Sequence, residues 1–355
     1  MIGRDVASSY DLDRLSIATL ASHSALQIMH GAKAEGLRTL LVSTRERLPL
    51  YREFSHIIDE IVVVDRWRDL CRQDVVKRLR ESNAILVPHG SLVEYVGHEC
   101  AENIELPIFG LRTLFRVEAS QREKMELLRD AGIPTPPSYS IDEDFEDLVI
   151  VKLPGAKGGK GYFIAMSSRE VRQRLRELVE RGLIKDPREA LIQKYIVGVP
   201  IYIHYFYSPT LDRVEITGAD IRYETNVDGL RRLPPRILEE IGIEPSFVVV
   251  GNIPVVLRES MLVKALDYGR RFAEATKRKL PPGIIGPYCL EAIATPNLEI
   301  VVFEFSGRIV AGTNLYVAGS PYTHLYWNEP MSVGRRIARE IRIAIEKNAL
   351  HKVVT

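Results

Sequence analysis

The sequence predicts an α/β protein, in which a Rossmann-like N-terminal domain precedes a mixed α and β region of two lobes. Strand and helix patterns alternate over roughly the first 115 of the 355 residues, which is typical of a parallel sheet covered by helices. The proline-rich segment IPTPPSYSI, residues 133–141, then marks a domain boundary. Beyond it, strand-like runs recur in pairs, which favours antiparallel hairpins.

The N-terminal region predicts four strands of the buried, apolar kind. They are LSIATLA (15–21), RTLLVST (38–44), EIVVVD (60–65) and AILVPHG (84–90). Helices are predicted between them at 24–36 and 74–82, where apolar residues recur at helical spacing. Because the region has no GxGxxG fingerprint, dinucleotide binding is not indicated.

A helix at 120–132 leads to the proline-rich boundary, and the remainder predicts three hairpins and two long helices. The hairpins pair 148–154 with 161–167, 190–196 with 200–208, and 288–294 with 299–308. The helices are SREVRQRLRELVERG (168–182) and SVGRRIAREIRIAIEKN (332–348). The predicted domain limits are 1–118, 119–197 and 198–355.

Composition excludes several classes of function. Lys and Arg number 48 and Asp and Glu 47, a net charge of +1, so no electrostatic footprint for nucleic acid or a membrane surface is expected. No apolar run has the length of a membrane span, and no signal peptide is indicated, which predicts a cytoplasmic protein. Cys71, Cys100 and Cys289 lie far apart and are expected to be buried apolar side chains rather than disulfide or zinc partners.

The glycine-rich stretch VIVKLPGAKGGKGYFIA, residues 149–165, is typical of a phosphate-binding loop. It is not a Walker A loop, because Lys160 is followed by Gly161 instead of Ser or Thr and a strand follows instead of a helix. The pattern predicts a hairpin whose glycine-lysine tip folds over phosphates. Lys152, in the incoming strand, needs an anionic partner if buried. A surface hairpin with solvated lysines is the alternative.

The stretch YCLEAIATPNLEIVVFEFSGR, residues 288–308, predicts a pair of facing carboxylates. A turn at 295–297 places Glu291 across from Glu304, where Cβ atoms lie only about 4.5–5.5 Å apart. Two such carboxylates need a proton or a cation between them. Strand alternation also places Ser306 and Arg308 on the face of Glu304, which favours a site for magnesium and nucleotide phosphates. An exposed hairpin, or a register slip that separates the glutamates, is the alternative.

Two strand ends in the N-terminal domain carry polar residues suited to a ligand. Ser22, His23 and Ser24 lie at a strand-to-helix turn, where free N–H groups favour phosphate. The serines are also explained as helix caps, so His23 is the stronger candidate for a ligand contact. His89, Gly90 and Ser91 follow another strand of the same sheet, at the edge where open α/β sheets bind ligands. His89 alone is more often structural.

Together, the strand lysine, the glycine hairpin, an apolar hinge in LIQKYIVG and the facing carboxylates resemble the ATP-grasp superfamily. The resemblance implies a two-lobed ATP-grasp fold, ATP and Mg²⁺ (or Mn²⁺) as cofactors, metal binding by Glu291 and Glu304, and a phosphate or transition-state contact by Arg308. The ATP-binding residues that it implies are Lys152, Gly155, Lys157, Gly158, Gly159, Lys160, Gly161, Gln193, Lys194, Tyr195 and Ile196. Gln193 stands where many members have Glu, and Ser306 where most have Asn.

Several blocks resemble one branch more closely, the archaeal formate-dependent 5-formaminoimidazole-4-carboxamide ribonucleotide synthetases of purine biosynthesis. They include ATLASHSALQIMHGAKAEG, VPHGSLVEYVG, RYETNVDGL, GNIPVVLRESML and VVFEFSGRIVAGTN. This branch implies ATP- and formate-dependent formylation of aminoimidazole carboxamide ribonucleotide through formyl phosphate. It also implies substrate contacts by His23, Ser91 and Asn252, an ATP contact by Glu224, and a homotrimer or homohexamer.

Two departures keep other functions open. Leu111 replaces Asn in an FGNR-like pattern, and Glu291 stands where this branch often has Gln. A paralogous ATP-grasp ligase with a different acid or amine is therefore the near alternative. A nucleotide-binding regulator without catalytic activity is the alternative from another class, and the presence of both glutamates, the loop lysines and Arg308 argues against it.

Overall fold

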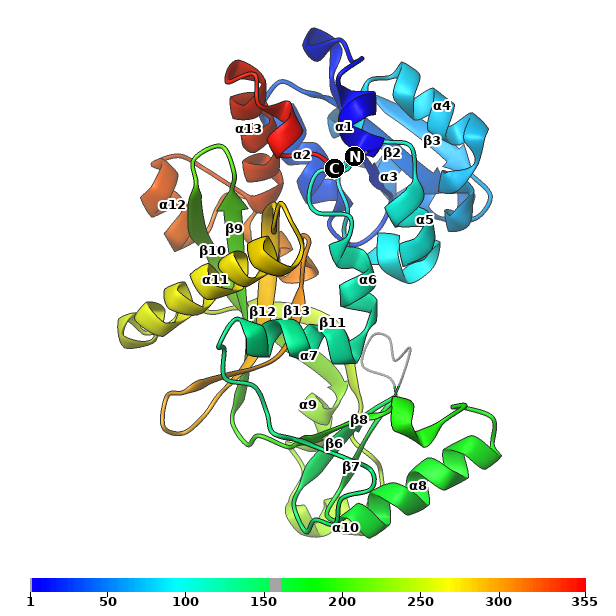
Figure 1. Ribbon diagram of the computed structural model, residues 1–355, viewed down its shortest axis with the longest axis vertical. Helices are drawn as coiled ribbons and strands as arrows, with labels where there is room; N and C mark the ends of the chain where they lie inside the picture. Colours follow the sequence, from blue (N-terminus) through cyan, green and yellow to red (C-terminus); the bar gives the residue numbers. More distant parts are fainter. Residues whose placement is uncertain (1, 154–160) are drawn as a thin grey trace.

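Three β-sheets organise the computed structural model of the chain, which describes residues 2–153 and 161–355 (Figure 1). The N-terminal sheet and its helices form one end of the molecule, a five-stranded sheet lies in the middle, and a small lobe forms the other end. Both chain termini lie side by side at the N-terminal end (Figure 1). None of the described helices is long and apolar enough to cross a membrane.

The first sheet is parallel, with the strand order β3-β2-β1-β4. Its strands are β1 (Ser16–Leu20), β2 (Arg38–Thr44), β3 (Glu60–Val64) and β4 (Ala84–Leu86), and this confirms the four predicted strands. The apolar runs of β1, β2 and β4 are buried, as inner parallel strands require, whereas edge strand β3 leaves Val63 exposed. The helices of this part are α1 (Ile2–Ala7), α2 (Ala25–Ala34), α3 (Leu48–Arg52), α4 (Gln73–Glu81), α5 (His98–Asn103) and α6 (Leu114–Ala119).

The small lobe contains an antiparallel sheet with the order β5-β8-β6-β7. Its strands are β5 (Ser138–Tyr139), β6 (Val149–Lys152), β7 (Tyr162–Ala165) and β8 (Leu191–Lys194), and α8 (Ser168–Glu180) packs against them. The predicted hairpin of β6 and β7 is confirmed. The predicted pairing of 190–196 with 200–208 is wrong, because β8 pairs with β5 and β6 and its Ile192 joins the small-lobe core. Two apolar runs close in sequence do not reveal which sheet each one joins.

The central sheet has the order β11-β10-β9-β12-β13, with all pairs antiparallel. Its strands are β9 (Val199–Ser208), β10 (Arg213–Asn226), β11 (Phe247–Pro254), β12 (Gly286–Ala294) and β13 (Ile300–Ser306). Long helix α11 (Glu259–Lys279) and α7 (Gln121–Asp130) lie across one face of it (Figure 1). A core of aromatic rings fills this interface: Tyr288 stacks on Tyr205 and Phe272, and Phe305 packs at a tilt against Phe272. The other helices of this part are α9 (Val227–Leu230), α10 (Pro235–Ile241) and α12 (Pro321–Trp327).

The C-terminal helix α13 (Val333–Glu346) returns to the N-terminal domain and packs against α2. Two glycines permit the close contact, since a Cβ on Gly31 would lie 2.1 Å from the backbone nitrogen of Arg335, and a Cβ on Gly334 would lie 2.2 Å from the carbonyl oxygen of Gln27. The end of the chain therefore packs against the N-terminal helices as well as the central sheet. The predicted domain limits stay predictions.

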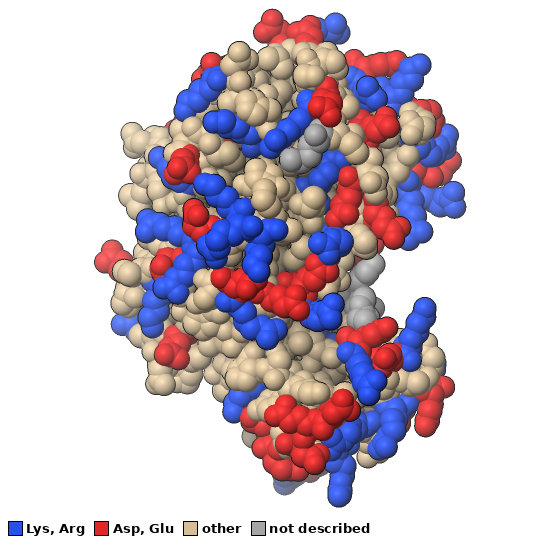
Figure 2. All heavy atoms as spheres, viewed as in Figure 1, with Lys and Arg blue, Asp and Glu red and all other residues tan. Residues whose placement is uncertain are grey.

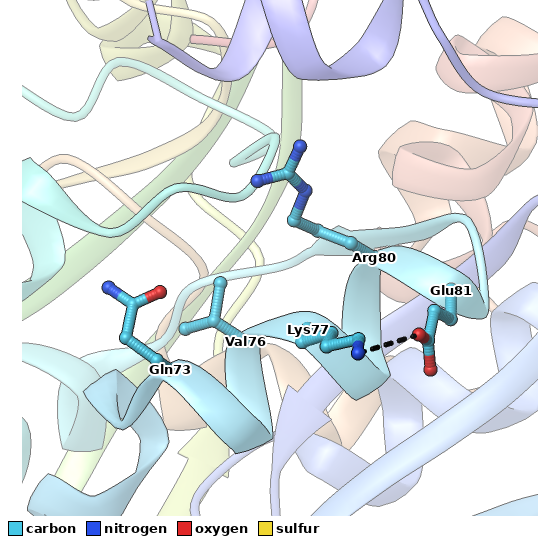
Figure 3. Close-up of a pocket in the computed structure, with 5 residues that line it drawn as sticks. All are labelled: Gln73, Val76, Lys77, Arg80 and Glu81. Carbon is cyan, nitrogen blue, oxygen red and sulfur yellow. Dashed lines mark ion pairs between the residues drawn. The ribbon is translucent and has the colours of Figure 1, made fainter.

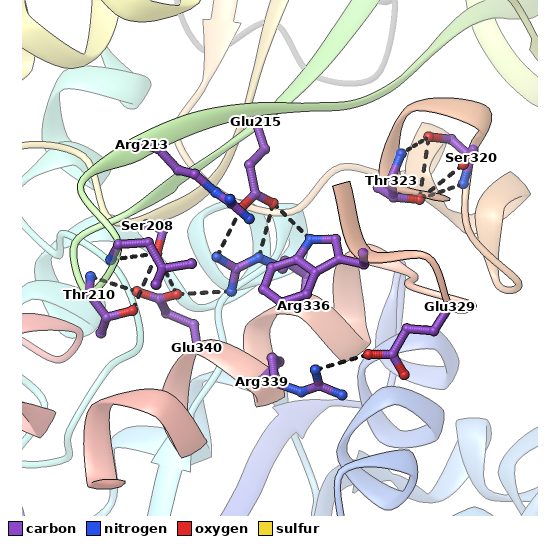
Figure 4. Close-up of polar contacts among 12 residues, drawn as sticks. Ser208, Thr210, Arg213, Glu215, Ser320, Thr323, Glu329, Arg336, Arg339 and Glu340 are labelled. Atoms are coloured by element: carbon purple, nitrogen blue, oxygen red, sulfur yellow. Dashed lines mark hydrogen bonds and ion pairs between the residues drawn. The ribbon is translucent and has the colours of Figure 1, made fainter. Parts of the chain in front are cut away.

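A buried ionic network anchors α13 to the central sheet (Figure 4). The guanidinium of Arg336 lies 3.0 Å from a Glu215 carboxylate oxygen and 2.9 Å from one of Glu340, and none of the three side chains is exposed. The same guanidinium lies 4.2 Å from the ring centre of Phe206 and 4.7 Å from that of Trp327. Arg336 therefore contacts both buried carboxylates between the strands and the helix, and Glu215 has a second partner in Arg213, 2.8 Å away.

The prediction that all three cysteines are unbonded apolar side chains is wrong for two of them. Cys71, at the end of the 3-10 helix Trp67–Cys71, forms a disulfide with Cys100 in α5, and their Cα atoms lie 6.3 Å apart. Their separation of 29 positions in the sequence hides this proximity. Cys289 is free and buried, as expected.

Candidate active site

The face of the central sheet opposite α11 carries a row of polar side chains. Strand alternation sends Ile201, Ile203 and Tyr205 of β9 into the core. The residues between them, with their neighbours on β10, β12 and β13, contact one another on the other face. This row comprises Tyr202, His204, Asp220, Arg222, Glu291, Glu304 and Ser306.

The predicted facing carboxylates are confirmed, since Glu291 pairs with Glu304 in the register of β12 and β13. Each one has a basic partner: Glu291 lies 2.9 Å from an Arg222 guanidinium nitrogen, and Glu304 forms an ion pair with Lys124. Ser306 donates a hydrogen bond to Glu291 over 3.1 Å. Burial alone would raise the pKa of Glu304, but Lys124 and neighbouring Lys152 lower it to about 2. Both carboxylates are therefore held next to positive charge.

Lys124 and Arg222 are site residues that the sequence reasoning missed. Lys124 is buried on α7, where burial would lower its pKa, but Glu304 raises the pKa above its ordinary value. The sequence did carry a signal for Lys124: it lies four residues before Leu128, which places it on the apolar face of the helix. A lysine on such a buried face needs an anionic partner. Arg222 lies over the ring of Tyr202, 3.8 Å from its centre, and Glu291 raises its pKa despite burial.

Lys152 lies in β6 where the small lobe meets the central sheet. Its ammonium donates to the carbonyl oxygen of Phe303 over 3.2 Å and lies 5.1 Å from the centre of that ring. Burial lowers its pKa, and Glu304 opposes this effect. Among the residues described, no carboxylate forms an ion pair with Lys152. A buried ammonium in this position is well suited to an anionic ligand.

The glycine-rich loop is described only at its edge. Gly155, Lys157, Gly158, Gly159 and Lys160 lie outside the described residues. Gly161 has a φ of +86°, a conformation that favours glycine, and its carbonyl oxygen accepts a 2.9 Å hydrogen bond from the backbone nitrogen of Leu153.

The predicted hinge, residues 191–198, comprises β8 and the residues that follow it, and it contacts α7 through Gln193. Gln193 is buried and donates to the sulfur of Met125 over 3.2 Å, while its amide oxygen is buried without a partner among the described atoms. Lys194 forms an ion pair with Asp147 at 2.7 Å, and the backbone nitrogen of Tyr195 donates to Leu148 over 2.8 Å. Partly buried Ile196 follows. The backbone N–H of Tyr195 thus already donates a hydrogen bond within the small lobe.

Glu224 lies at an irregularity in the pairing of β10 with β11. Burial, reinforced by Asp228 and Glu291, raises the pKa of Glu224 to about 7 although Arg222 opposes the shift. Its backbone nitrogen donates to Asp228 over 2.5 Å. Glu224 therefore belongs to the same electrostatic cluster as the facing carboxylates.

The N-terminal domain contributes His23 and Ser91 from the ends of β1 and β4. His23 has a φ of +52° and its ring stacks on His89, with ring centres 5.3 Å apart. The ring is exposed to solvent, yet the protein crowded around it, with His89 and Arg308, lowers its pKa well below the ordinary value. Exposure combined with crowding is typical of a concave surface. Ser91 donates to Ser22 over 3.0 Å.

Arg308 connects the two halves of the site. Its guanidinium forms a 2.9 Å ion pair with Glu118, while its Nε is buried without a partner among the described atoms. A Cβ on Gly90 would lie 3.3 Å from the Arg308 guanidinium and 3.1 Å from the Nε2 atom of His23. Glycine at position 90 thus allows the cation and His23 to lie close together.

Asn252 reaches the same face from the edge strand β11, where it pairs with Arg222 in the register. Its amide nitrogen donates to Asp220 over 2.6 Å. Leu111, by contrast, is buried in the core beside the central sheet. The leucine that replaces Asn of the FGNR-like pattern is therefore a core packing residue in this chain.

The surface is hollowed between the small lobe and the rest of the molecule, and charged side chains of both signs border the hollow (Figure 2). A separate surface hollow of about 250 Å³ lies on α4, formed by Gln73, Val76, Lys77, Arg80 and Glu81 (Figure 3). All of its lining residues come from one helix, and none is a predicted site residue. It has no evident connection to the chemistry of the site.

The carboxylate pair fits a magnesium ion by the nature of its donors. No group of three or more His, Cys, Asp or Glu side chains that could hold a metal occurs in residues 2–153 and 161–355. Mg²⁺ commonly binds one or two carboxylates together with water and substrate phosphates, so Glu291 and Glu304 suffice as protein ligands. Either one would exchange its basic partner for the metal.

Comparisons with known proteins agree with this arrangement. Residues 17–139 match a protein family of unknown function, DUF1246, and residues 170–355 match a domain of unknown function, DUF1297. The 5-formaminoimidazole-4-carboxamide-1-(beta)-D-ribofuranosyl 5'-monophosphate synthetase of Ignicoccus hospitalis is 56% identical over 350 residues, which cover 99% of each chain.

Solved structures agree on the fold. An IMP biosynthesis protein, PurP, from Thermococcus kodakaraensis matches with a TM-score of 0.76 and 32% identity, over 96% of this chain and 100% of that one. A biotin carboxylase from Campylobacter jejuni, solved as its beta-gamma-ATP complex, matches with a TM-score of 0.63 and 13% identity, over 91% and 70% of the two chains. These are ATP-grasp proteins, so the predicted fold class is confirmed.

Proposed function

The chain belongs to the family of 5-formaminoimidazole-4-carboxamide ribonucleotide synthetases, and from this membership we propose how its residues perform the reaction. It is an ATP-grasp ligase that forms a carbon–nitrogen bond in IMP biosynthesis. One juxtaposition carries the proposed mechanism: Arg308 lies beside His23 of the first domain and closely follows β13, the strand that carries Glu304. The ribotide and the ATP phosphates would meet at this point.

ATP binds between the small lobe and the central sheet. Lys152 supplies a buried ammonium for the phosphates, and the backbone of 194–196, at and after the end of β8, would face adenine. The ATP contacts predicted for Gly155, Lys157, Gly158, Gly159 and Lys160 lie outside the described residues and stay predictions. Glu224 is suited to accept from a ribose hydroxyl, because carboxylates accept hydrogen bonds strongly.

Glu291 and Glu304 would hold magnesium. The ion, when bound, neutralises charge on the ATP phosphates. Lys152 and Arg308 add positive charge from the chain itself, and Ser306 orients Glu291 through its hydrogen bond. This local concentration of cations suits a reaction that assembles three anions: ATP, formate and the ribotide phosphate.

Formate is the acyl donor in this proposal. A formate oxygen attacks the γ-phosphorus of ATP, the bond to the bridging oxygen breaks, and ADP leaves with formyl phosphate formed. The 5-amino nitrogen of aminoimidazole carboxamide ribonucleotide then attacks the formyl carbon, and phosphate leaves. The nitrogen loses one proton and becomes the formamido product. Lys152 and Arg308 favour both steps, because they stabilise charge on the transferred phosphoryl group.

The ribotide binds at the carboxyl ends of β1 and β4, facing the central sheet. His23 and Ser91 lie at these strand ends, and Asn252 approaches from β11. Ligands commonly bind at this edge of open α/β sheets. The cytoplasmic location, the homotrimer or homohexamer, and the absence of nucleic-acid or membrane partners stay predictions.

The reaction is tested by ADP release from purified protein with ATP, Mg²⁺, formate and the ribotide, each omitted in turn. We expect release to require all four and the ribotide product to carry a formyl group, identified by mass. Replacement of formate by bicarbonate or acetate should give no product. Turnover with another acid, but not with formate, would move the chain to a different ATP-grasp ligase.

His23→Ala is expected to raise the KM for the ribotide about tenfold and to leave the KM for ATP within twofold. The reason is the loss of one polar contact on the ribotide side, and a tenfold change corresponds to about 1.4 kcal/mol. His30→Ala, an exposed histidine on α2, is the matched control and should change neither constant. An unchanged ribotide KM in His23→Ala would contradict the assignment.

A further inference from the structure

A short chain of hydrogen bonds runs behind Asn252. Its amide nitrogen donates to one carboxylate oxygen of Asp220 over 2.6 Å, and the other oxygen lies 2.6 Å from the Nε2 atom of His204. Asp220 and His204 are almost completely buried, each 1% exposed, whereas Asn252 is only partly buried at the sheet edge. The three side chains come from β11, β10 and β9, so a buried carboxylate supports one accessible amide.

The surroundings hold Asp220 in place. A Cβ on Gly312 would lie 2.1 Å from an Asp220 carboxylate oxygen, so the backbone of the 3-10 helix Ala311–Tyr316 closes over the carboxylate. The ring of Tyr316 packs edge-on against His204, with centres 6.4 Å apart. Rotation of the carboxylate away from Asn252 is therefore sterically opposed.

This arrangement determines which end of the Asn252 amide faces outward. The Asn252 amide nitrogen donates to an Asp220 carboxylate oxygen, so the NH₂ group of Asn252 faces Asp220. The amide oxygen then points away from Asp220, and no described residue donates to it. A free, oriented acceptor of this kind selects an N–H or O–H donor and disfavours a phosphate oxygen.

We propose that Asp220, which is hydrogen-bonded to His204, is a positioning residue that orients the side chain of Asn252. In this orientation the amide oxygen of Asn252 accepts a hydrogen bond from an N–H of the ribotide's aminoimidazole carboxamide. The proposal rests on the proposed function, in which Asn252 contacts the ribotide. It adds that Asn252 recognises the base rather than the 5′-phosphate. Asp220 itself does not touch the substrate.

Asp220→Asn tests the proposal, because an amide at position 220 can donate as well as accept and releases Asn252 to turn. We expect the ribotide KM to rise about 10- to 100-fold, the range set by hydrogen bonds to charged groups. The KM for ATP should stay within twofold. An unchanged ribotide KM would overturn the proposal.

Three variants separate orientation from stability and from the proposed function. Asn252→Ala should raise the ribotide KM at least as much as Asp220→Asn; if it has no effect, the assignment of Asn252 to the ribotide fails, and this proposal with it. If Asn252→Ala raises the KM but Asp220→Asn does not, only the positioning role fails. Glu340→Gln, a buried carboxylate in the Arg336 network, is the matched control and should destabilise the protein without changing the ribotide KM.

Exchange of the two residues supplies the rescue. In Asp220→Asn/Asn252→Asp the donor and acceptor trade places, the hydrogen bond is kept and an oxygen still points outward. We expect this double variant to recover part of the lost ribotide affinity, and a double variant worse than both single variants would overturn the proposal. If Asp220→Asn does not fold, the single variant Asn252→Asp is measured instead. We expect it to raise the ribotide KM by the same factor, and an unchanged ribotide KM would overturn the proposal.

Discussion

Glu304→Gln is expected to abolish ADP release and, at the same time, to destabilise the fold. The loss of activity follows from its proposed role as a metal ligand. Substitution of residues that only support metal ligands already costs about 10- to 100-fold, so a ligand should cost more than about 100-fold. The measurement is ADP release with all four components present.

The loss of stability follows from Lys124. From the sequence alone, the substitution is expected to leave the fold intact. The structure instead shows Glu304 as the ion-pair partner of a buried lysine, so removal of the carboxylate charge leaves an ammonium uncompensated. Breaking a buried pair in this way costs about 3–5 kcal/mol of the free energy of unfolding. We expect the lower end, because the side chain of Glu304 is 23% exposed.

The double variant Lys124→Met/Glu304→Gln separates the two effects. It removes both charges, so the free energy of unfolding, measured by urea denaturation, should return towards that of the wild type. Activity should stay absent. Recovery of ADP release in the double variant would show that Glu304 acts only on stability and would contradict its assignment as a metal ligand.

Arg336→Met is expected to lower the free energy of unfolding by about 3–5 kcal/mol, because it leaves Glu340 buried without a cation and leaves Glu215 paired only with partly exposed Arg213. The contacts with Phe206 and Trp327 are partly kept by the methionine side chain. Urea denaturation followed by circular dichroism measures the change. The ribotide and ATP KM values of the protein that remains folded should be unchanged, since the network lies outside the proposed site.

Arg342→Met on the same helix is the matched control. Arg342 is exposed, and its guanidinium donates a hydrogen bond to the backbone carbonyl oxygen of Glu35. Its expected cost is at most about 1 kcal/mol. The triple variant Arg336→Met/Glu215→Leu/Glu340→Leu should recover most of the stability lost in Arg336→Met, since apolar replacement of a whole buried network is often neutral. Equal losses in Arg336→Met and Arg342→Met would contradict the importance of the buried network.

Local patterns in the sequence were sufficient for most of the strands, for the helices at 168–182 and 332–348, and for one register, but β10, β11 and the longest helix, α11, were not predicted. The parallel sheet follows from apolar runs alternating with amphipathic helices, and the Glu291–Glu304 pair follows from a turn signal and strand alternation. These features depend on residues close together in the chain. The resemblance of whole sequence blocks then indicated the family, which the comparisons confirm.

Contacts between distant segments were decided only by the tertiary structure. The sequence does not reveal that β8 pairs with β6 instead of β9, that Cys71 meets Cys100, or that α13 returns to α2. The partners of the carboxylates, Lys124 and Arg222, come from a helix and a strand far from the hairpin in sequence. The physical reason is that apolar pattern and turn chemistry act over a few residues, whereas ion pairs, disulfides and sheet order depend on how the whole chain packs.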